Sequence, residues 1–384
     1  MLLFDGHLDL AMNAIEWNRD LTQPLGLIRD REAGQKDLPG RGNATVSLPE
    51  LRRAGAGMVV ATQIARIKHP GYSPSFAWGS AAQAWAMTQA QLAWYRAMEE
   101  KGEMIQIRDA AGLQEQLRRW DSAAPKPAEP RAGTEEEESR SVECTATTDD
   151  LRPVGYLLSL EGADSLISLD HLHRAWAYGL RAVGPAHYGP AVYANGTDAS
   201  GGFPPRGKEL LREMQGLGMI LDVTHLCDEC FWEALDMYTG PIWASHHNAR
   251  ALVSHNRQMS DGMFKALLEH DMVVGVAFDA WMIVPGWRRG QSTPQEAGAT
   301  LEKLADHIDH YCQLASDSRH VGIGSDLDGG FGSEQTPVEI GTIADVQQLG
   351  PILRRRGYSE TDVEGIFSQN FLRFLQRVMT HWES

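Results

Sequence analysis

The sequence has no surplus of basic residues. Its 384 residues include 35 Lys and Arg against 51 Asp and Glu, which gives a formal net charge of −16. Nucleic acids and anionic membranes are recognised through basic patches, so this balance argues against both kinds of partner. The acidic charge favours solubility and says nothing further about the fold.

Long apolar runs are also missing. No stretch of about 20 consecutive apolar residues occurs, and a transmembrane helix needs one. The first residues, MLLFDGHLDL, lack the basic, apolar and cleavage regions of a secretion signal, and the last, RVMTHWES, lack the apolar tail of a lipid-anchor signal. The sequence therefore predicts a cytoplasmic protein without a membrane partner.

Cysteine is scarce. Only four cysteines occur, which fits a reducing compartment. Cys227 and Cys230 have C-x-x-C spacing, but no second cysteine pair accompanies them. We interpret them as ordinary thiols of a helix that packs near the core.

Short apolar, β-branched runs alternate with amphipathic helical patterns along the whole chain. Helical stretches such as KELLREMQGLG and ATLEKLADHIDHYCQLA have apolar residues three and four positions apart. Eight such alternations predict one α/β domain over residues 1–384, a (β/α)8 TIM barrel, rather than two domains. The predicted strands cover residues 2–4, 58–62, 155–160, 179–183, 219–223, 241–244, 272–277 and 320–324.

One segment, at about 121–150, departs from this pattern. It reads DSAAPKPAEPRAGTEEEESRSVECTATTDD and is rich in Pro, Ala, Glu, Ser and Thr. Such a composition buries too little apolar surface to offset the entropy lost on ordering. We predict an exposed acidic insertion before the third strand.

Polar side chains follow six of the eight predicted strands. In a (β/α)8 barrel the active site lies at the C-terminal ends of the strands, so these residues are expected to meet. They are Asp5, His7 and Asp9 after the first strand, Glu161 after the third, His187 past the fourth, His225 after the fifth, His246 and His247 after the sixth, and Asp326 and Asp328 after the eighth.

These residue types suit a pair of metal ions. His7 and Asp9 are two positions apart on an extended segment, so both can reach one metal. His225 and His246 end successive apolar runs, and imidazole is a ligand suited to zinc. Glu161 would be costly to bury without a cation and can bridge two of them. The sequence therefore predicts a binuclear metal site at the C-terminal ends of the strands.

Such a site has a definite chemistry. Two cations about 3.5–4 Å apart can hold one water and deprotonate it, and the bridging hydroxide then attacks a carbonyl. Asp326 follows the last strand, where it can accept the proton of the water and pass it to a leaving amine. A weak ligand or an orienting carboxylate remain alternative roles for Asp326.

Six stretches together resemble the renal (membrane) dipeptidase family of metallopeptidases, which belongs to the amidohydrolase superfamily. The resemblance extends from the fifth residue to the last predicted strand. The matching stretches are DGHLDL at 5–10, SLEGADSL at 159–166, LRAVGPAH at 180–187, LGMILDVTH at 217–225, PIWASHHNARAL at 241–252 with NRQMSD at 256–261, and HVGIGSDLDG at 320–329.

The resemblance implies a zinc-dependent dipeptidase with two Zn²⁺ per chain. By that resemblance His7 and Asp9 bind one zinc, His225 and His246 bind the other, and Glu161 bridges them. The family ligand directly follows the Ser of S-H-x-x-A, which selects the first histidine of the pair at 246–247. The implied substrates are small dipeptides, including some with a C-terminal D-residue. Relatives often dimerise, so a homodimer remains open.

Three further roles follow from the same resemblance. His187 matches the histidine that contacts the substrate and stabilises the tetrahedral oxyanion. Arg257 matches the arginine that holds the C-terminal carboxylate of the substrate, and Asp326 matches the proton-transferring aspartate. Leu8 and the run at 189–198 depart from the family pattern beside the substrate pocket, so they bear on substrate identity rather than on hydrolysis.

Two other functions compete with this one. A related binuclear amidohydrolase could act on a lactam, a lactone or another small amide, but many of those enzymes use a carboxylated Lys where this chain has Glu161. A binding protein without catalysis would be expected to have lost a ligand or Asp326, and all are present.

Overall fold

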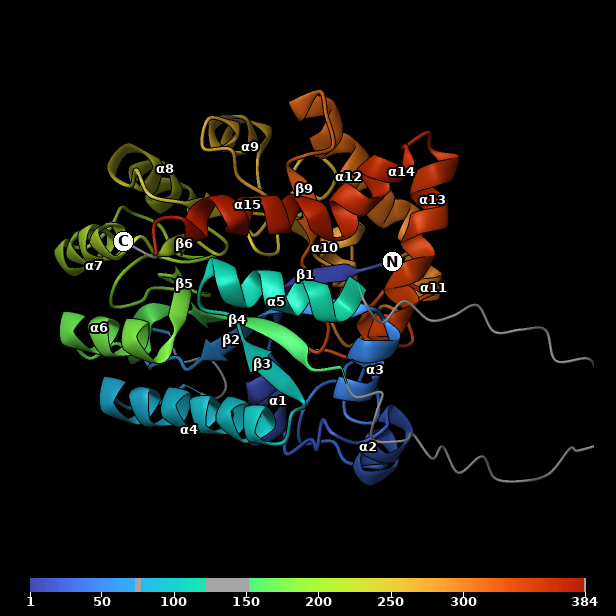
Figure 1. Cartoon of the computed structure of the whole chain (residues 1–384), viewed down its shortest axis with the longest axis horizontal. Helices are drawn as coiled ribbons and strands as arrows, with labels where there is room; N and C mark the ends of the chain where they lie inside the picture. Colours follow the sequence, from blue (N-terminus) through green and yellow to red (C-terminus); the bar gives the residue numbers. More distant parts are fainter. Residues whose placement is uncertain (73–76, 122–151, 383–384) are drawn as a thin grey trace, which may run out of the picture.

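The computed structural model describes residues 1–72, 77–121 and 152–382. Eight parallel strands pair in the order β7-β6-β5-β4-β2-β1-β9-β8. Figure 1 labels several of them, among them β1, β2 and β4 near the middle of the molecule. A parallel bridge between Ala244 and Val274 brings the two ends of this order together, so the predicted (β/α)8 barrel is confirmed. The strands are β1 Leu3–Leu8, β2 Ala56–Ile64, β4 Val154–Glu161, β5 Leu180–Gly184, β6 Ile220–Asp222, β7 Ile242–Trp243, β8 Val274–Val276 and β9 Val321–Ile323.

The first strand is longer than predicted, because it continues through His7 to Leu8. A ninth strand, β3 (Met104–Gln106), was not predicted; it has only three residues and pairs with the first half of β4, while β5 pairs with the second half. The acidic insertion predicted at about 121–150 lies, apart from Asp121, outside the described residues.

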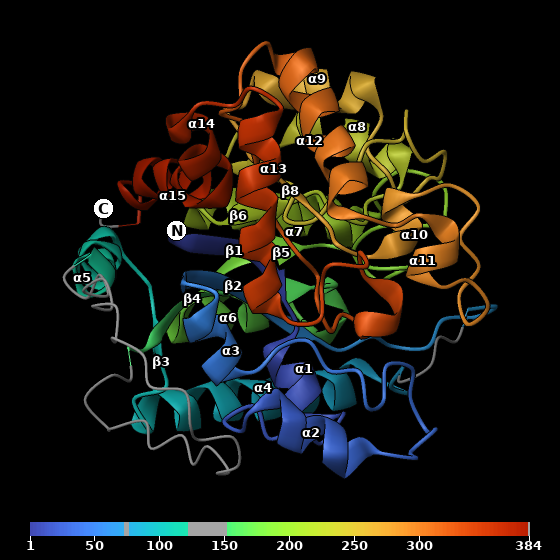
Figure 2. The same cartoon turned by 90° about the vertical axis from the view of Figure 1, so that its right-hand side faces the viewer.

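Helices are ranged around the central strands (Figure 2). They occur between successive strands, as a barrel of this kind requires. The longer ones are α4 Ala81–Glu100, α5 Ala110–Asp121, α6 Leu169–Tyr178, α7 Pro205–Leu217, α8 Asp228–Met237, α9 Asp261–Leu268, α12 Leu301–Ala315 and α15 Asn370–Met379. The shorter ones are α1 Leu10–Ile15, α2 Leu25–Glu32, α3 Leu48–Arg53, α10 Ala280–Ile283, α11 Pro294–Ala297, α13 Leu349–Arg355 and α14 Glu360–Glu364, followed by a π turn at Gly365–Gln369.

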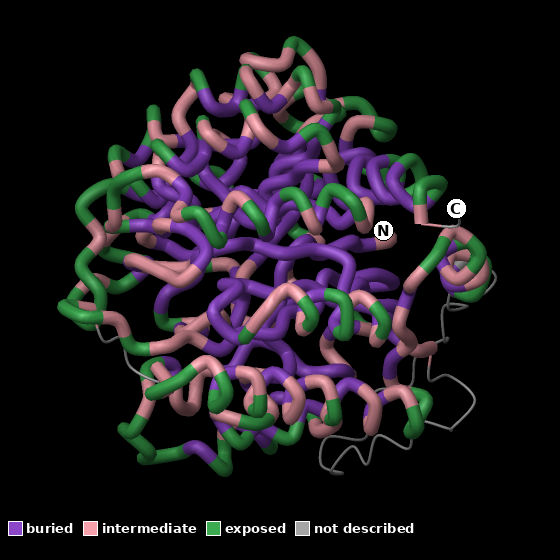
Figure 3. The backbone as a smooth tube through the Cα atoms, turned by 90° about the vertical axis from the view of Figure 1, so that its left-hand side faces the viewer, coloured by how far each residue is buried: buried purple, intermediate pink, exposed green. Residues whose placement is uncertain are grey.

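Local sequence explains these elements. Strand β4 reads VGYLLSLE, and all eight residues are buried, as expected for a parallel strand covered on both faces. Helix α12 begins after Thr300, whose side chain accepts a hydrogen bond from the Lys303 amide. Figure 3 shows the result: the buried backbone forms the centre and the exposed segments form the periphery.

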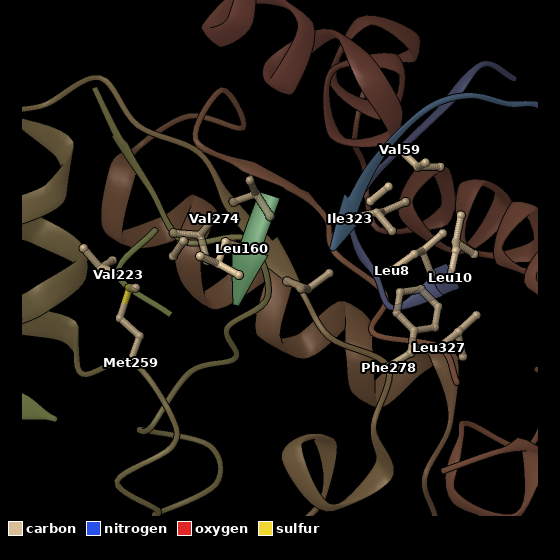
Figure 4. Close-up of a cluster of buried hydrophobic side chains, with 14 of the residues drawn as sticks. Leu8, Leu10, Val59, Leu160, Val223, Met259, Val274, Phe278, Ile323 and Leu327 are labelled. Carbon is tan, nitrogen blue, oxygen red and sulfur yellow. The ribbon is translucent and has the colours of Figure 1, made fainter. Parts of the chain in front are cut away.

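The strand side chains that face the helices and the barrel interior form the apolar core. Figure 4 shows part of it, with Leu8, Leu160, Val223 and Ile323 from four different strands or strand ends. Each is 3% exposed or less, and burying such a side chain contributes about 1.5–3 kcal/mol. Burial of these side chains therefore holds the ends of β1, β4, β6 and β9 in place.

The two thiols of the C-x-x-C spacing behave as predicted. Cys227 precedes α8 and Cys230 lies in its first turn; both are buried and neither forms a disulfide. Within the described ranges, no helix combines the length and apolarity needed to cross a bilayer.

Backbone contact between neighbouring strand ends depends on two glycines. A Cβ built at Gly275 would lie 2.0 Å from the Ser245 carbonyl oxygen, and one built at Gly324 would lie 1.8 Å from the same atom. These distances are far below any tolerated contact, and the obstructing atom is backbone that cannot swing away. Glycine is therefore required where β7, β8 and β9 meet.

We predict that Gly324→Ala lowers the free energy of unfolding by about 1–3 kcal/mol, because the added methyl group must push the Ser245 backbone aside. Thermal unfolding of the purified chain measures this as a lower Tm. Gly216→Ala is the matched control: a Cβ there meets nothing within 4 Å, and the position lies inside α7. The control should gain about 0.5–1 kcal/mol. Equal Tm values for the two variants would contradict the close-approach argument.

Candidate metal centre and active site

The C-terminal ends of four strands carry the five predicted ligands. His7 lies within β1 and Asp9 follows it; Glu161 is the last residue of β4; His225 and His246 follow β6 and β7. All five side chains are buried, with exposed fractions between 1% and 7%. The barrel therefore brings together residues from His7 to His246, which lie 239 positions apart in the sequence.

Three of these side chains already have the spacing of metal ligands. His225 Nε2 lies 3.3 Å from Glu161 Oε1 and 3.3 Å from His246 Nε2, and His246 Nε2 lies 3.5 Å from Glu161 Oε1. Ligands at the usual zinc distances of about 2.0–2.1 Å in a tetrahedron stand about 3.3–3.4 Å from one another. The triangle of donor atoms thus has the size of one face of a zinc site.

The second cluster centres on His7. Its Nε2 atom lies 3.8 Å from Asp9 Oδ1, 3.7 Å from Glu161 Oε1 and 3.8 Å from Asp326 Oδ1. This buried nitrogen has no hydrogen-bond partner. A buried polar atom without a partner is costly, and three carboxylate oxygens around it call for a cation in their midst. Glu161 belongs to both clusters.

The electrostatics of the site fit a divalent cation. Burial, with a contribution from Arg257, lowers the pKa of His7 to about 3, and burial holds the pKa of His225 well below its usual range. These imidazoles are therefore neutral and offer a lone pair. Burial raises the pKa of Asp9 to about 6 and that of Glu161 well above its usual value, where the charge of Asp9 adds to the effect. Such carboxylates ionise fully only beside a positive charge.

Hydroxyl groups orient two of the imidazoles. Thr197 Oγ1 lies 3.2 Å from His225 Nδ1, and Ser245 Oγ lies 2.9 Å from His246 Nδ1. A hydroxyl can accept the Nδ1 hydrogen, which leaves the Nε2 lone pair facing Glu161. This is the arrangement that a metal-binding histidine needs.

Two site residues adopt a left-handed backbone. His225 has φ of 69° and Asp326 has φ of 57°, values that non-glycine residues rarely take. The chain here has to turn at the end of a short strand while its side chain still points into the barrel mouth. Backbone strain of this kind is concentrated at functional sites.

A cavity of about 390 Å³ opens beside the donor cluster. His187, Arg257 and Asp326 line it together with four of the five predicted ligands, Asp9, Glu161, His225 and His246. The Arg257 side chain is 2% exposed; its Nη2 donates to the His246 carbonyl oxygen at 3.0 Å, while Nη1 has no partner. A buried guanidinium with an unused donor is suited to bind a carboxylate. All eight predicted site residues thus lie at one end of the barrel.

The prediction missed several cavity residues. Arg66 comes two residues after β2, and Asp279 comes three residues after β8, the two strands to which no site residue was assigned. Asp279 accepts from Arg289, which also lines the cavity, at 2.9 Å. A search for polar residues after each predicted strand could have found both positions. Arg66 was missed because the search did not include arginine, and Asp279 was missed because it lies two residues past the predicted strand end at 277.

The fold and this donor set define a metal-dependent hydrolase of the parallel-barrel class. The chain belongs to the membrane dipeptidase family, peptidase family M19, whose sequence model matches residues 1–383. The family resemblance derived from the six sequence stretches is therefore confirmed.

Similar proteins agree with this assignment. An uncharacterized dipeptidase of Schizosaccharomyces pombe is 29% identical over 225 residues, which cover 57% of this chain and 52% of the relative. The match thus spans about half the length of that relative.

Two solved structures have the same fold. The dipeptidase AC, a metallopeptidase, has a TM-score of 0.74 at 22% identity, with 99% of each chain covered. A metallopeptidase of Rhodobacter sphaeroides has a TM-score of 0.72 at 22% identity, with 98% of this chain and 99% of that chain covered. At these identities the likeness concerns the barrel fold.

We predict that metal binding stabilises the chain more at neutral than at acidic pH. The pKa of Asp9 rises from 3.8 to about 6 on folding, so the metal-free folded state retains a proton that the unfolded state releases. That contribution to stability is present at low pH and is lost as the pH rises through 6. Bound metal replaces the proton, so its stabilising effect grows over the same range.

Thermal unfolding with zinc and with a chelator, at about pH 5 and about pH 7.5, checks this. The gap between the two Tm values should widen at the higher pH. Asp9→Asn removes the titrating group, so the gap should depend less on pH in that variant. A gap that stays constant in the wild type would contradict the prediction.

Proposed function

We propose that this chain is a two-zinc dipeptidase that hydrolyses small dipeptides with free amino and carboxyl ends. The proposal rests on one observation: a single cavity is lined both by the potential metal ligands around Glu161 and by Arg257, a buried arginine whose Nη1 has no hydrogen-bond partner. In this proposal His7 and Asp9 hold one zinc, His225 and His246 hold the other, and Glu161 bridges them.

The size of the cavity favours a short substrate. Its volume of about 390 Å³ is near the lower end of the usual range for ligand pockets, about 300–1,000 Å³. Arg257 would pair with the C-terminal carboxylate, and this contact selects a dipeptide over a longer chain whose second residue has no free carboxylate. The binding energy of that ion pair would position the peptide bond against the donor cluster.

The remaining residues have complementary roles in the proposed reaction. Two bound zinc ions would supply Lewis-acid polarisation of the scissile carbonyl and a lowered pKa for a shared water. His187 would donate a hydrogen bond to the carbonyl oxygen as it gains negative charge. Asp326 would accept a proton and deliver it to the leaving amine; burial and the charge of Asp9 raise its pKa, which favours a carboxylate that can hold a proton.

We extend the proposal to dipeptides with a C-terminal D-residue. The Rhodobacter sphaeroides metallopeptidase of the same fold was solved with a phosphinate mimic of the dipeptide L-Ala-D-Ala. A carboxylate clamp at Arg257 would bind the same group in either stereoisomer, so the chirality of the C-terminal residue is not read by that contact.

The first test is turnover of L-Ala-L-Ala and L-Ala-D-Ala by the purified chain, with zinc and with a chelator. We expect zinc-dependent hydrolysis of both, and a loss of at least 100-fold in kcat/KM in His225→Ala, because that variant removes a donor from the triangle of ligand atoms. No turnover of any dipeptide by a chain that binds about two zinc ions would move the substrate to a lactam, a lactone or another small amide.

The second test concerns Arg257. We predict that Arg257→Met loses about 10- to 100-fold in kcat/KM on the free dipeptide, through a higher KM, and no longer distinguishes it from the dipeptide amide. Arg118→Met is the matched control, because Arg118 is exposed on α5, pairs with Glu115 at 2.7 Å and does not line the cavity. A wild-type chain that cleaves the amide as fast as the free dipeptide would refute the carboxylate clamp.

A further inference from the structure

His187 has a neighbour of a different kind from those of the other two histidines around the cavity. The Nη1 atom of Arg66 lies 3.2 Å from His187 Nδ1. His187 is in the loop after β5, and Arg66 follows β2, so the contact joins two strand ends that the barrel brings together. Both residues line the cavity.

The chemistry of the guanidinium fixes the direction of this hydrogen bond. Arginine carries five N–H donors and no acceptor, and it stays protonated at any working pH. Nδ1 of His187 must therefore be the acceptor. A neutral imidazole has one ring hydrogen, so that hydrogen resides on Nε2.

The opposite holds for the proposed zinc ligands. His225 and His246 each have Nδ1 beside a hydroxyl, from Thr197 and Ser245, and a hydroxyl can accept a hydrogen. Their Nε2 atoms then carry lone pairs, which a cation can use. The neighbours at Nδ1 thus divide the three histidines into two kinds: His225 and His246 can offer a lone pair to a metal, and His187 can donate an N–H hydrogen bond.

We propose that Arg66 is a positioning residue: its guanidinium holds His187 in the Nε2–H tautomer, so that His187 donates to the substrate oxyanion and does not bind zinc. This inference rests on the proposed dipeptidase function. It also settles a geometric ambiguity, since a ring nitrogen of His187 lies within 4.8 Å of ligand atoms of Glu161 and His225. Distance alone would admit His187 as a further zinc ligand beside Glu161, His225 and His246, but a hydrogen on Nε2 leaves that atom without a lone pair for a metal.

The electrostatic surroundings support the neutral form. Burial, the Arg66 charge and the Arg257 charge all lower the pKa of His187 well below its usual range. In a neutral imidazole whose Nδ1 accepts from Arg66, the single ring hydrogen is on Nε2.

Kinetics of Arg66→Met and Arg66→Lys test the proposal. We expect Arg66→Met to lower kcat about 10- to 100-fold with KM changed less than threefold, since the tautomer matters most when the oxyanion forms. Arg66→Lys should recover part of kcat, because an ammonium also donates only. Zinc content should stay at the wild-type value in both variants, and Arg118→Met, on the exposed face of α5, should match the wild type in kcat and KM. An unchanged kcat in Arg66→Met would overturn the proposal.

A direct readout of the tautomer separates this inference from the proposed function. Two-bond ¹H–¹⁵N correlation on the full zinc-loaded chain with ¹⁵N-labelled histidine, assigned by the signal lost in His187→Gln, reports which ring nitrogen carries the hydrogen. We expect Nε2–H for His187 in the wild type and a mixture in Arg66→Met. A hydrogen on Nδ1 in the wild type would overturn the proposal even if dipeptides are hydrolysed. Failure to hydrolyse any dipeptide would refute the proposed function and leave the tautomer result to decide the role of Arg66.

Discussion

The burial of carboxylates close to one another is the constraint on which the site depends. Burial is the main reason why the pKa values of Asp9, Glu161 and Asp326 are raised, and the charge of Asp9 adds to the rise for Glu161 and for Asp326. Replacement by neutral groups would relieve the cost of ionising them, yet all three occupy strand ends where the fold holds them in place. The arrangement becomes favourable once divalent cations supply the opposing charge. The carboxylates at this end of the barrel therefore indicate a metal-binding site.

A second set of carboxylates holds the ligand-bearing backbone. Asp5 Oδ1 accepts from the amides of His7 and Ser325, which ties β1 to the turn after β9. Asp222 Oδ1 accepts from the amides of Thr224 and Ser245, which ties β6 to the end of β7. Burial raises the pKa of both, and these amide hydrogen bonds partly oppose the rise. Asp5 lies two residues before His7 and Asp222 lies three residues before His225, so these amide-to-carboxylate hydrogen bonds help to position two of the predicted ligands.

The barrel and most of its site could be predicted from the sequence, because parallel strands buried on both faces read as apolar runs and active-site residues follow such runs. The strand boundaries were predicted less well. The first strand was predicted to end at residue 4, but β1 continues through the buried polar residues Asp5 and His7 to Leu8. Strand β3 was missed because, unlike the short strands β6, β8 and β9, it is only partly buried, with Met104 as its one buried residue. Arg66 escaped because a lone arginine after a strand resembles any surface arginine until its neighbour is known.

The histidines show most clearly where sequence reasoning stops. His187, His225 and His246 each come after an apolar run, and nothing in their local sequence distinguishes a ligand from a hydrogen-bond donor. The distinction depends on the atom beside Nδ1, which comes from position 66 for the first and from position 197 for the second. Only the fold brings these residues within hydrogen-bonding distance. A neighbour that can only donate leaves the imidazole hydrogen on Nε2, whereas an acceptor draws it to Nδ1. In the proposed mechanism, one residue type would therefore perform two different tasks within the same cavity.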